Sequence, residues 1–244
     1  MLKWPLKVLK WLALLFFSTS ILAVVIYRFI PVPVTPLMLI RCVEQVRAGE
    51  KIQLHHDWEP LSNISPHLPV AVMASEDQLF LLHNGFDVES IKKAHEHNKT
   101  HARKLGGSSI SQQTAKNVFL WNGRNFVRKG LEAYFTFLME LFWSKQRIME
   151  VYLNSIEMGK GIYGAEAVAQ LHFGKRASEL TRSECALIAA SLPNPIKRNS
   201  QHPTKYMLKR QRQIEHQMKF MPKFPKEGES YDPSTSSGGI YHKK

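Results

Sequence analysis

The residues best suited to chemistry in this chain form a polar segment that starts with two glycines. Residues 106–117 read Gly-Gly-Ser-Ser-Ile-Ser-Gln-Gln-Thr-Ala-Lys-Asn, within a window, residues 97–131, that holds seven Lys or Arg and no Asp or Glu. A glycine pair lets the backbone approach a ligand, and Ser109 and Gln112 have the capping-box spacing of a helix N-terminus with free N–H groups. This pattern suits an anion, most simply a phosphate group. An ordinary loop-to-helix junction with a solvated basic face is the alternative.

An acidic motif upstream, residues 74–87, favours the ligand-binding interpretation. It follows the apolar run 70–74, so an apolar helix is expected to end at Glu76. A carboxylate that emerges from apolar surface is partly desolvated, which raises its pKa and suits it to proton abstraction. Glu76, Phe80 and His83 would share one helix face if the helix continues that far. The competing interpretation is a helix-end carboxylate with Asp77 as a solvated neighbour.

Together the two motifs resemble the catalytic module of the peptidoglycan glycosyltransferases, glycosyltransferase family 51, which are membrane enzymes that polymerise lipid II. Further segments match in the family's order, namely residues 128–132, 145–154, 161–170 and 187–195. The resemblance covers about residues 60–200. Ser109 stands where the family usually carries Thr, so the hydroxyl is kept. The whole chain is similar in layout to the monofunctional biosynthetic members found in Gram-negative bacteria.

The resemblance implies a hexosyltransferase, or transglycosylase, of cell-wall biogenesis and cell shape. It would join lipid II into β-1,4-linked glycan strands with inversion and release undecaprenyl pyrophosphate. Such a leaving group needs charge neutralisation rather than a proton, so the chemistry asks for one base plus cations. Glu76 would deprotonate the acceptor 4-hydroxyl, and Glu132 is the family's second acidic residue. The substrate-binding residues that we expect are Lys116, Arg124, Arg128 and Lys129 for phosphates, Ser108, Ser109, Gln112, Gln113 and Asn117 for hydrogen bonds, and Asp77, Phe80 and His83 beside the base.

The role of Glu132 stays open at this point. A carboxylate cannot stabilise pyrophosphate directly, so Glu132 must orient cations or bind a divalent metal. Simple pairing with Arg128, four residues earlier on a helix, is the plainest alternative. The sequence requires no cofactor with certainty, and Mg²⁺ or Mn²⁺ remains open.

The composition of the chain restricts the kinds of partner that it can bind. The chain has 244 residues and a net charge of +13, from 33 Lys or Arg against 20 Asp or Glu. This balance implies a polyanionic partner: nucleic acid, an anionic lipid surface or a phosphorylated substrate. Nothing resembles a nucleic-acid-binding signature, so we expect no nucleic acid. The expected partners are lipid II, the lipid-linked glycan strand and membrane phospholipids, with proteins of cell division or cell-wall synthesis left open.

Cys42 and Cys185 are expected to be free thiols rather than a disulfide.

An apolar segment near the start predicts a membrane anchor. Residues 11–26 hold no charged side chain, and residues 8–30 can span a bilayer, which needs roughly 20 apolar residues. Lys3, Lys7 and Lys10 precede the segment, so the positive-inside rule places the N-terminus in the cytoplasm. A cleaved signal peptide is the competitor, although no clear small-x-small cleavage site is visible. We expect a single-pass inner-membrane protein with its catalytic domain in the periplasm.

Periodicity predicts a mainly α fold. Helical patterns cover residues 37–49, 88–97, 131–143, 145–156, 163–173 and 203–221, and another helix opens after Thr181. The expected organisation is a cytoplasmic stub and transmembrane anchor over 1–30, a glycosyltransferase domain over 31–221, and a disordered tail over 222–244. The resemblance further implies a lysozyme-like domain with a smaller, membrane-associated lobe.

Two rival functions remain. A lytic muramidase would share a lysozyme-like fold and one glutamate, but it would not need the acid-free basic window. A non-catalytic membrane scaffold of the cell-wall machinery fits the anchor equally well, but it would leave the polar residues without a purpose.

Overall fold

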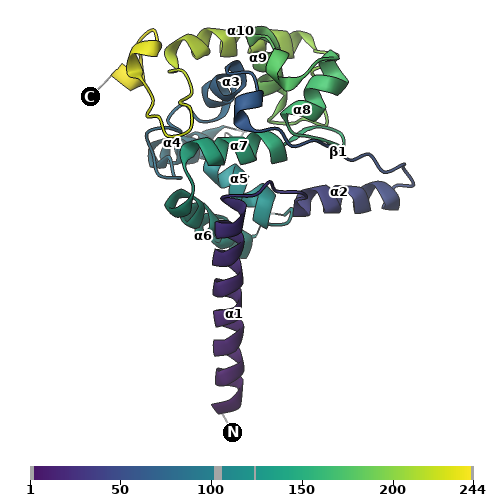
Figure 1. Ribbon diagram of the computed structural model, residues 1–244, viewed down its shortest axis with the longest axis vertical. Coiled ribbons are helices and arrows are strands. Elements are labelled where there is room, and N and C mark those ends of the chain that lie inside the picture. The colour runs from purple at the N-terminus through teal and green to yellow at the C-terminus, as the bar shows by residue number, and fades with distance from the viewer. Residues whose placement is uncertain (1–2, 102–105, 124, 243–244) are drawn as a thin grey trace.

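The computed structural model describes residues 3–101, 106–123 and 125–242. Its first helix, α1 (Lys3–Tyr27), projects from a helical body, as Figure 1 shows. The stretch Leu6–Tyr27 is long and apolar enough to cross a membrane, and little of it is buried against the rest of the chain. The segment that the sequence predicts as an anchor therefore forms one continuous helix, with the length and composition that a membrane span requires.

The body is mainly helical, as the sequence predicts. In chain order its α-helices are α2 (Pro36–Arg47), α3 (His67–Glu76), α4 (Val88–Thr100), α5 (Ile110–Phe119), α6 (Phe126–Phe142), α7 (Lys145–Ser155), α8 (Ala165–Val168), α9 (Arg182–Ser191) and α10 (Lys205–Gln217). The strands β1 (His55–His56), β2 (Glu157–Gly159) and β3 (Ile162–Tyr163) form a small sheet in the order β1-β3-β2, with β1 parallel and β2 antiparallel to β3.

The core lies around α3, whose residues from Leu68 to Ala74 are buried. Helix α3 packs against α9 and α10, while α5 packs against α6 and α7. Helix α3 ends at Glu76, as expected, so Glu76, Phe80 and His83 do not share a helix face. The helix does not continue further because Asp77 leaves the helical conformation and its carboxylate accepts the Ile110 N–H.

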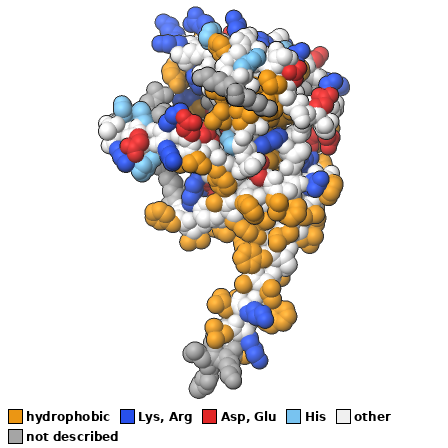
Figure 2. Space-filling view, turned by 90° about the vertical axis from the view of Figure 1, so that its left-hand side faces the viewer, with side chains coloured by type: hydrophobic (Ala, Val, Ile, Leu, Met, Phe, Trp, Pro, Cys, Tyr) orange, Lys and Arg blue, Asp and Glu red, His pale blue; other side chains and the backbone are white. Residues whose placement is uncertain are grey.

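Helix α1 is fixed to the body at its C-terminal end. Ser20 Oγ is hydrogen bonded to Tyr134 OH on α6 at 2.8 Å, and Trp143 Nε1 donates to the Val24 carbonyl at 2.8 Å. Next to this contact, α6 exposes an apolar face that includes Phe126, whose side chain is 97% exposed, with Phe137 and Leu141. Figure 2 shows hydrophobic side chains gathered around the base of the body, where the stem emerges.

Several element boundaries differ from those predicted. Helix α4 continues to Thr100, and α6 begins at Phe126 rather than at residue 131, because Asn125 Oδ1 accepts the Arg128 N–H as an N-cap. The segment 163–173 is divided between β3, α8 and a π-helical turn, η2 (Ala169–Phe173), which Gly174 ends in a left-handed conformation. Cys42 and Cys185 are free thiols, as expected.

The C-terminal segment packs on the body in a way that its composition did not indicate. Its Pro-, Gly- and Ser-rich sequence predicts disorder. In the structure it contains the short 3₁₀ turns η5 (Pro233–Thr235) and η6 (Ile240–His242), and the side chain of Tyr241 is only 3% exposed. Disorder of this segment stays a prediction.

Candidate active site

Glu76 is the last residue of α3 and lies half-buried at the surface of the core. Ser75 Oγ donates to its Oε1 at 3.2 Å, and Gln113 Nε2 on α5 donates to its Oε2 at 3.3 Å. Burial raises the pKa of the Glu76 carboxyl. The two hydrogen bonds and the positive charge of Arg210 oppose this rise in pKa, while Asp77 adds to it. A carboxylate with a raised pKa and defined donors suits a general base.

A hydrogen-bonded chain holds this carboxylate in place. Tyr152, fully buried on α7, donates its hydroxyl to Gln113 Oε1 at 3.2 Å. That bond fixes the amide so that its NH₂ group points at Glu76. The segment 145–154 therefore reaches the base through the segment 106–117, and three helices, α3, α5 and α7, hold the carboxylate together.

Asp77 plays a structural part rather than that of a solvated neighbour. It is buried, its carboxylate is hydrogen bonded to His83 Nε2 at 3.0 Å, and it accepts the Ile110 N–H at 2.9 Å. This last bond satisfies one of the free N–H groups at the start of α5. Asp77 thus joins the acidic motif to the glycine-rich motif.

The start of α5 has the predicted capping box. Ser109 Oγ accepts the Gln112 N–H at 3.1 Å, and Gln112 Oε1 accepts the Ser109 N–H at 3.1 Å. The Ser109 hydroxyl also donates to the Gly85 carbonyl. Gly85 has a φ of +85°, and a Cβ there would lie 2.8 Å from Thr136 Cγ2, so only glycine fits. Both members of the capping box are buried, so their main role is to hold the start of α5 in place.

A cationic cluster follows on α5 and α6. Arg128 Nη1 donates to Glu132 Oε2 at 3.0 Å, and Lys129 Nζ donates to Glu132 Oε1 at 2.5 Å. Glu132 is 3% exposed, whereas the Lys129 side chain is about half exposed. Both oxygens of the Glu132 carboxylate therefore bind cations, an arrangement that orients positive charge.

Lys116 belongs to the same electrostatic cluster. Burial lowers the pKa of its ammonium group, Glu132 raises it, and Arg128 and Lys129 lower it further. Among the described residues no carboxylate lies within ion-pair distance of Lys116. Lys116 is one helix turn beyond Gln113, so the residue that touches the base and the half-buried cation share one face of α5.

A cavity of about 360 Å³ opens beside the base. Glu76 and Asp77 line it together with Gly106, Gly107, Ser108 and Ser109. Ile240 from the C-terminal segment forms part of the same wall, although the two regions are far apart in sequence. The cavity is large enough for a sugar unit, and it joins the carboxylate to the glycine-rich segment.

Not every expected substrate contact is brought together. Phe80 has no exposed surface and packs in the core, and the imidazole of His83 is already hydrogen bonded to the Asp77 carboxylate. The Asn117 side chain is buried on α5, with an Nδ2 group that has no hydrogen-bond partner in the described part of the chain. Arg124 lies outside the described residues. The other expected residues lie beside the cavity or in the cationic cluster, where a substrate could contact them. They are Glu76, Gln113, Ser108, Lys116, Arg128, Lys129 and Glu132.

The residues present do not form a preformed metal site. Within the described ranges, no group of three or more His, Cys, Asp or Glu side chains is arranged to hold an ion. Glu132 is the carboxylate on which the Mg²⁺ or Mn²⁺ that the sequence leaves open would depend, and Arg128 and Lys129 already bind both of its oxygens. The donor set therefore fits orientation of cations better than metal ligation.

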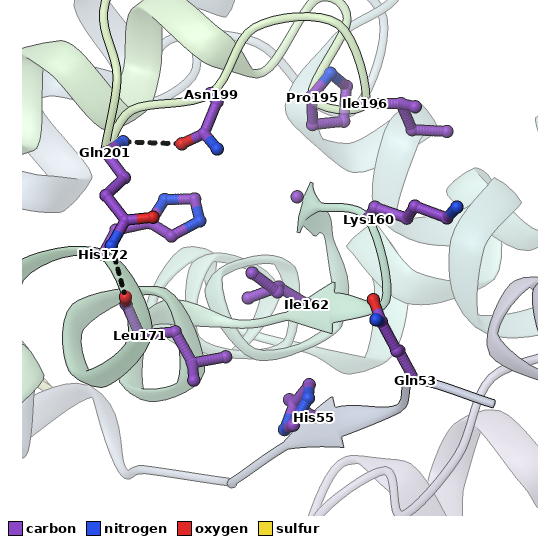
Figure 3. A pocket seen from close by; sticks show the side chains of 11 residues that line it. Gln53, His55, Lys160, Ile162, Leu171, His172, Pro195, Ile196, Asn199 and Gln201 are labelled. Carbon is purple, nitrogen blue, oxygen red and sulfur yellow. Dashed lines mark hydrogen bonds between the residues drawn. The ribbon is translucent and has the colours of Figure 1, made fainter. Parts of the chain in front are cut away.

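A second cavity, shown in Figure 3, is separate from Glu76. It lies between the small sheet and the segment after α9, and its charged or titratable lining residues are His55, Lys160 and His172. His172 Nδ1 is hydrogen bonded to Ser200 Oγ at 2.7 Å. A wall without a carboxylate offers no strong base next to a cluster of cations, so the cavity beside Glu76 is the candidate active site.

Sequence reasoning missed the residues that reach the site from distant segments. Tyr152 and Arg210 lie in segments predicted only as helices, and Ile240 lies in the segment predicted as a disordered tail. Their contacts depend on tertiary packing that periodicity does not report. Tyr152 itself was the one available signal in the sequence, because the hydroxyl of a buried tyrosine requires a hydrogen-bond partner.

Comparisons with known proteins give one consistent result. A family model described as Transglycosylase matches residues 44–219. The chain is 59% identical over 222 residues to the biosynthetic peptidoglycan transglycosylase of Bacteroides thetaiotaomicron, covering 90% of each chain. It is 55% identical to the protein of the same name from Caulobacter vibrioides, covering 83% of this chain and 86% of the relative. The protein of that name from Bdellovibrio bacteriovorus is 53% identical, with 87% and 83% covered.

Proposed function

The chain belongs to the transglycosylase family, and we propose that it polymerises lipid II at the Glu76 site and releases undecaprenyl pyrophosphate. It is a peptidoglycan transglycosylase of cell-wall synthesis, in keeping with the names of its relatives. One observation gives the main support for lipid II polymerisation at Glu76. Helix α5 places Gln113 against the carboxylate of Glu76 and, one turn later, Lys116 in the cationic cluster around Glu132.

The proposed reaction has one base and one neutralised leaving group. Glu76 takes the proton from the 4-hydroxyl of the acceptor sugar, and that oxygen attacks the anomeric carbon of the lipid-linked donor chain. The bond from this carbon to the phosphate oxygen breaks, and its electron pair leaves with the pyrophosphate. Lys116, Arg128 and Lys129 hold this growing negative charge, with Arg124 as a further expected contributor. Attack from the opposite face gives the inverted β-1,4 linkage.

The carboxylates around Glu76 support transfer over hydrolysis. A lytic glycosidase needs a second acidic group to work with the first. Asp77 is the adjacent candidate, and its carboxylate is buried and committed to His83 and to the backbone of α5. Glu132 is committed to two cations. Asp87 and Glu89 also line the cavity, but Asp87 accepts the Ser90 N–H as the N-cap of α4, and Glu89 pairs with Lys93 at the exposed surface. We infer from these commitments that Glu76 acts alone as the base, which favours the transferase over the muramidase.

The membrane placement is also part of the proposal. Helix α1 would span the inner membrane with its N-terminus in the cytoplasm, because Lys7 and Lys10 flank that end. The apolar face of α6 beside α1 would then contact phospholipid acyl chains. This arrangement would keep a lipid-linked substrate in the bilayer while its sugars reach the periplasmic cavity.

Product analysis with the purified full-length chain tests this function. Incubation with lipid II should give a polymeric glycan that a muramidase then digests, together with undecaprenyl pyrophosphate. Incubation with finished glycan should release no soluble muropeptides. A chain that releases muropeptides and forms no polymer would be a lytic enzyme, and a folded chain inactive on both substrates would be a scaffold.

A further inference from the structure

The C-terminal residues 222–242, here called the strap, run down the side of the body and return to the region of the base. Figure 1 shows this segment in yellow at the edge of the body, beyond α10. Tyr241 joins the hydrophobic core, and Phe224, Tyr231 and Ile240 pack against that core. The strap lies beyond residue 219, where the match to the family model ends.

The strap is tied to the body at both ends of its path. Gln146 Nε2 on α7 donates to the carbonyls of Lys226 at 3.1 Å and Glu229 at 3.0 Å. Farther along, the Ser237 N–H donates to the Lys219 carbonyl at 2.7 Å. These backbone contacts give the segment a defined course despite its polar composition.

Three contacts join the strap to the residues around Glu76. Tyr241 OH donates to the Gln78 carbonyl at 2.8 Å, two residues after the base. The ring of Phe224 stacks on that of Phe80, with centroids 6.4 Å apart and planes inclined by 18°. Ile240 lines the cavity that Glu76 also lines. The strap therefore supports the loop after α3 from outside and closes one side of the cavity.

This cavity corresponds to the sugar end of the acceptor. It contains Glu76, which would take the proton of the acceptor hydroxyl, and its lining does not include Lys116, Arg128 or Lys129, which would hold phosphates. Sugar rings have apolar faces that pack on aliphatic side chains. Ile240 offers such a side chain next to the base.

We propose that the strap completes the acceptor side of the active site, with Tyr241 as a positioning residue for the loop after Glu76 and Ile240 as a wall against the acceptor sugar. The proposal rests on the transferase function above. Without the strap, the loop of Gln78 loses its outer hydrogen bond and water gains access to the Glu76 carboxylate. The base then becomes less ordered and better hydrated.

The pH profile reports this hydration. Burial is the main cause of the raised pKa of Glu76, so added water should bring that pKa down toward its ordinary value. Among the described residues, the charged or titratable groups that act on Glu76 are Asp77 and Arg210, and Tyr152 also lies near it. Asp87, Glu89 and Lys93 line the same cavity. None of these residues belongs to the strap, so they stay in place when it is altered. Activity requires ionised Glu76, and its acid limb should therefore move to lower pH.

The test uses full-length chains with lipid II in detergent, and measures kcat, KM and the pH profile of kcat/KM. Tyr241→Phe keeps the ring and removes the bond to Gln78, so kcat should fall about 3- to 10-fold. Ile240→Ser should raise KM for lipid II. A stop after Met221 should do both and shift the acid limb downward. Affinity for a phosphoglycolipid donor mimic should be unchanged in all three variants.

Tyr231→Phe is the matched control, because Tyr231 is a strap tyrosine that contacts the ring of Tyr241 rather than Gln78. It should behave as wild type. Wild-type kcat, KM and pH profile in both Tyr241→Phe and Ile240→Ser would overturn the proposal even if the truncated chain does not fold. A rise in kcat after truncation would also overturn it, since the strap would then be an inhibitory lid. An inactive wild-type chain would instead refute the proposed function.

Discussion

Glu76 shows how opposing interactions set the properties of one carboxyl group. Burial at the end of α3 favours its neutral form, while donors from Ser75 and Gln113 favour its charged form. The outcome is a carboxylate whose pKa is raised but which stays hydrogen bonded and ready to accept a proton. Because Gln113 is fixed by the buried Tyr152, the balance depends on three helices rather than on Glu76 alone.

Glu132 is the residue at which cation orientation and metal binding can be separated. Its negative charge raises the pKa of Lys116, whose own burial lowers it. We predict that Glu132→Gln lowers the pKa of Lys116 further, so that the ammonium group loses its proton at a lower pH. Binding of a phosphoglycolipid donor mimic to this variant should then weaken at a lower pH than in wild type.

Titration of donor-mimic affinity against pH, with and without Mg²⁺ or Mn²⁺, measures this effect. Lys116→Ala provides the reference, and it should lose about 1.5–3 kcal/mol of binding free energy for the lost charged hydrogen bond. Loss of wild-type activity with a chelator, restored by added metal, would instead assign Glu132 to a metal site.

At the scale of elements, α5 links the base to the phosphate-binding cations, and its start is set by Ser109. We predict that Ser109→Ala destabilises the chain by about 1–2 kcal/mol, because it removes the N-cap of α5 and a bond to Gly85. Ser109→Thr keeps the hydroxyl and should be close to wild type. Thermal unfolding in detergent measures both, and equal midpoints for Ala and wild type would show that the cap contributes nothing.

These elements also show what local sequence can and cannot predict. The apolar run before Glu76 and the spacing of Ser109 and Gln112 predict the end of α3 and the start of α5, because both depend on neighbouring residues. The bond from Tyr152 to Gln113 spans 39 residues and depends on how α7 packs on α5. The place of Asp77 is beyond local sequence for a similar reason, since its carboxylate accepts the distant Ile110 N–H.

At the scale of the whole molecule, α1 and the apolar face of α6 define how the body would sit on a membrane. We predict that a periplasm-active reporter fused after residue 221 works and that one fused before Lys10 does not, because lysines flank the N-terminal end of α1. Reporter activity in intact cells measures this orientation. The reverse pattern would place the catalytic domain in the cytoplasm and contradict the proposed topology.

The central claim is that Glu76 is the base, and polymerisation by the Glu76→Gln variant tests it most directly. Glutamine keeps the shape and the position at the end of α3 but cannot accept the proton. We predict that turnover of lipid II falls by about 10²–10⁴-fold while affinity for the donor mimic stays unchanged. Near wild-type polymerisation by a folded Glu76→Gln chain would contradict the assignment and the mechanism built on it.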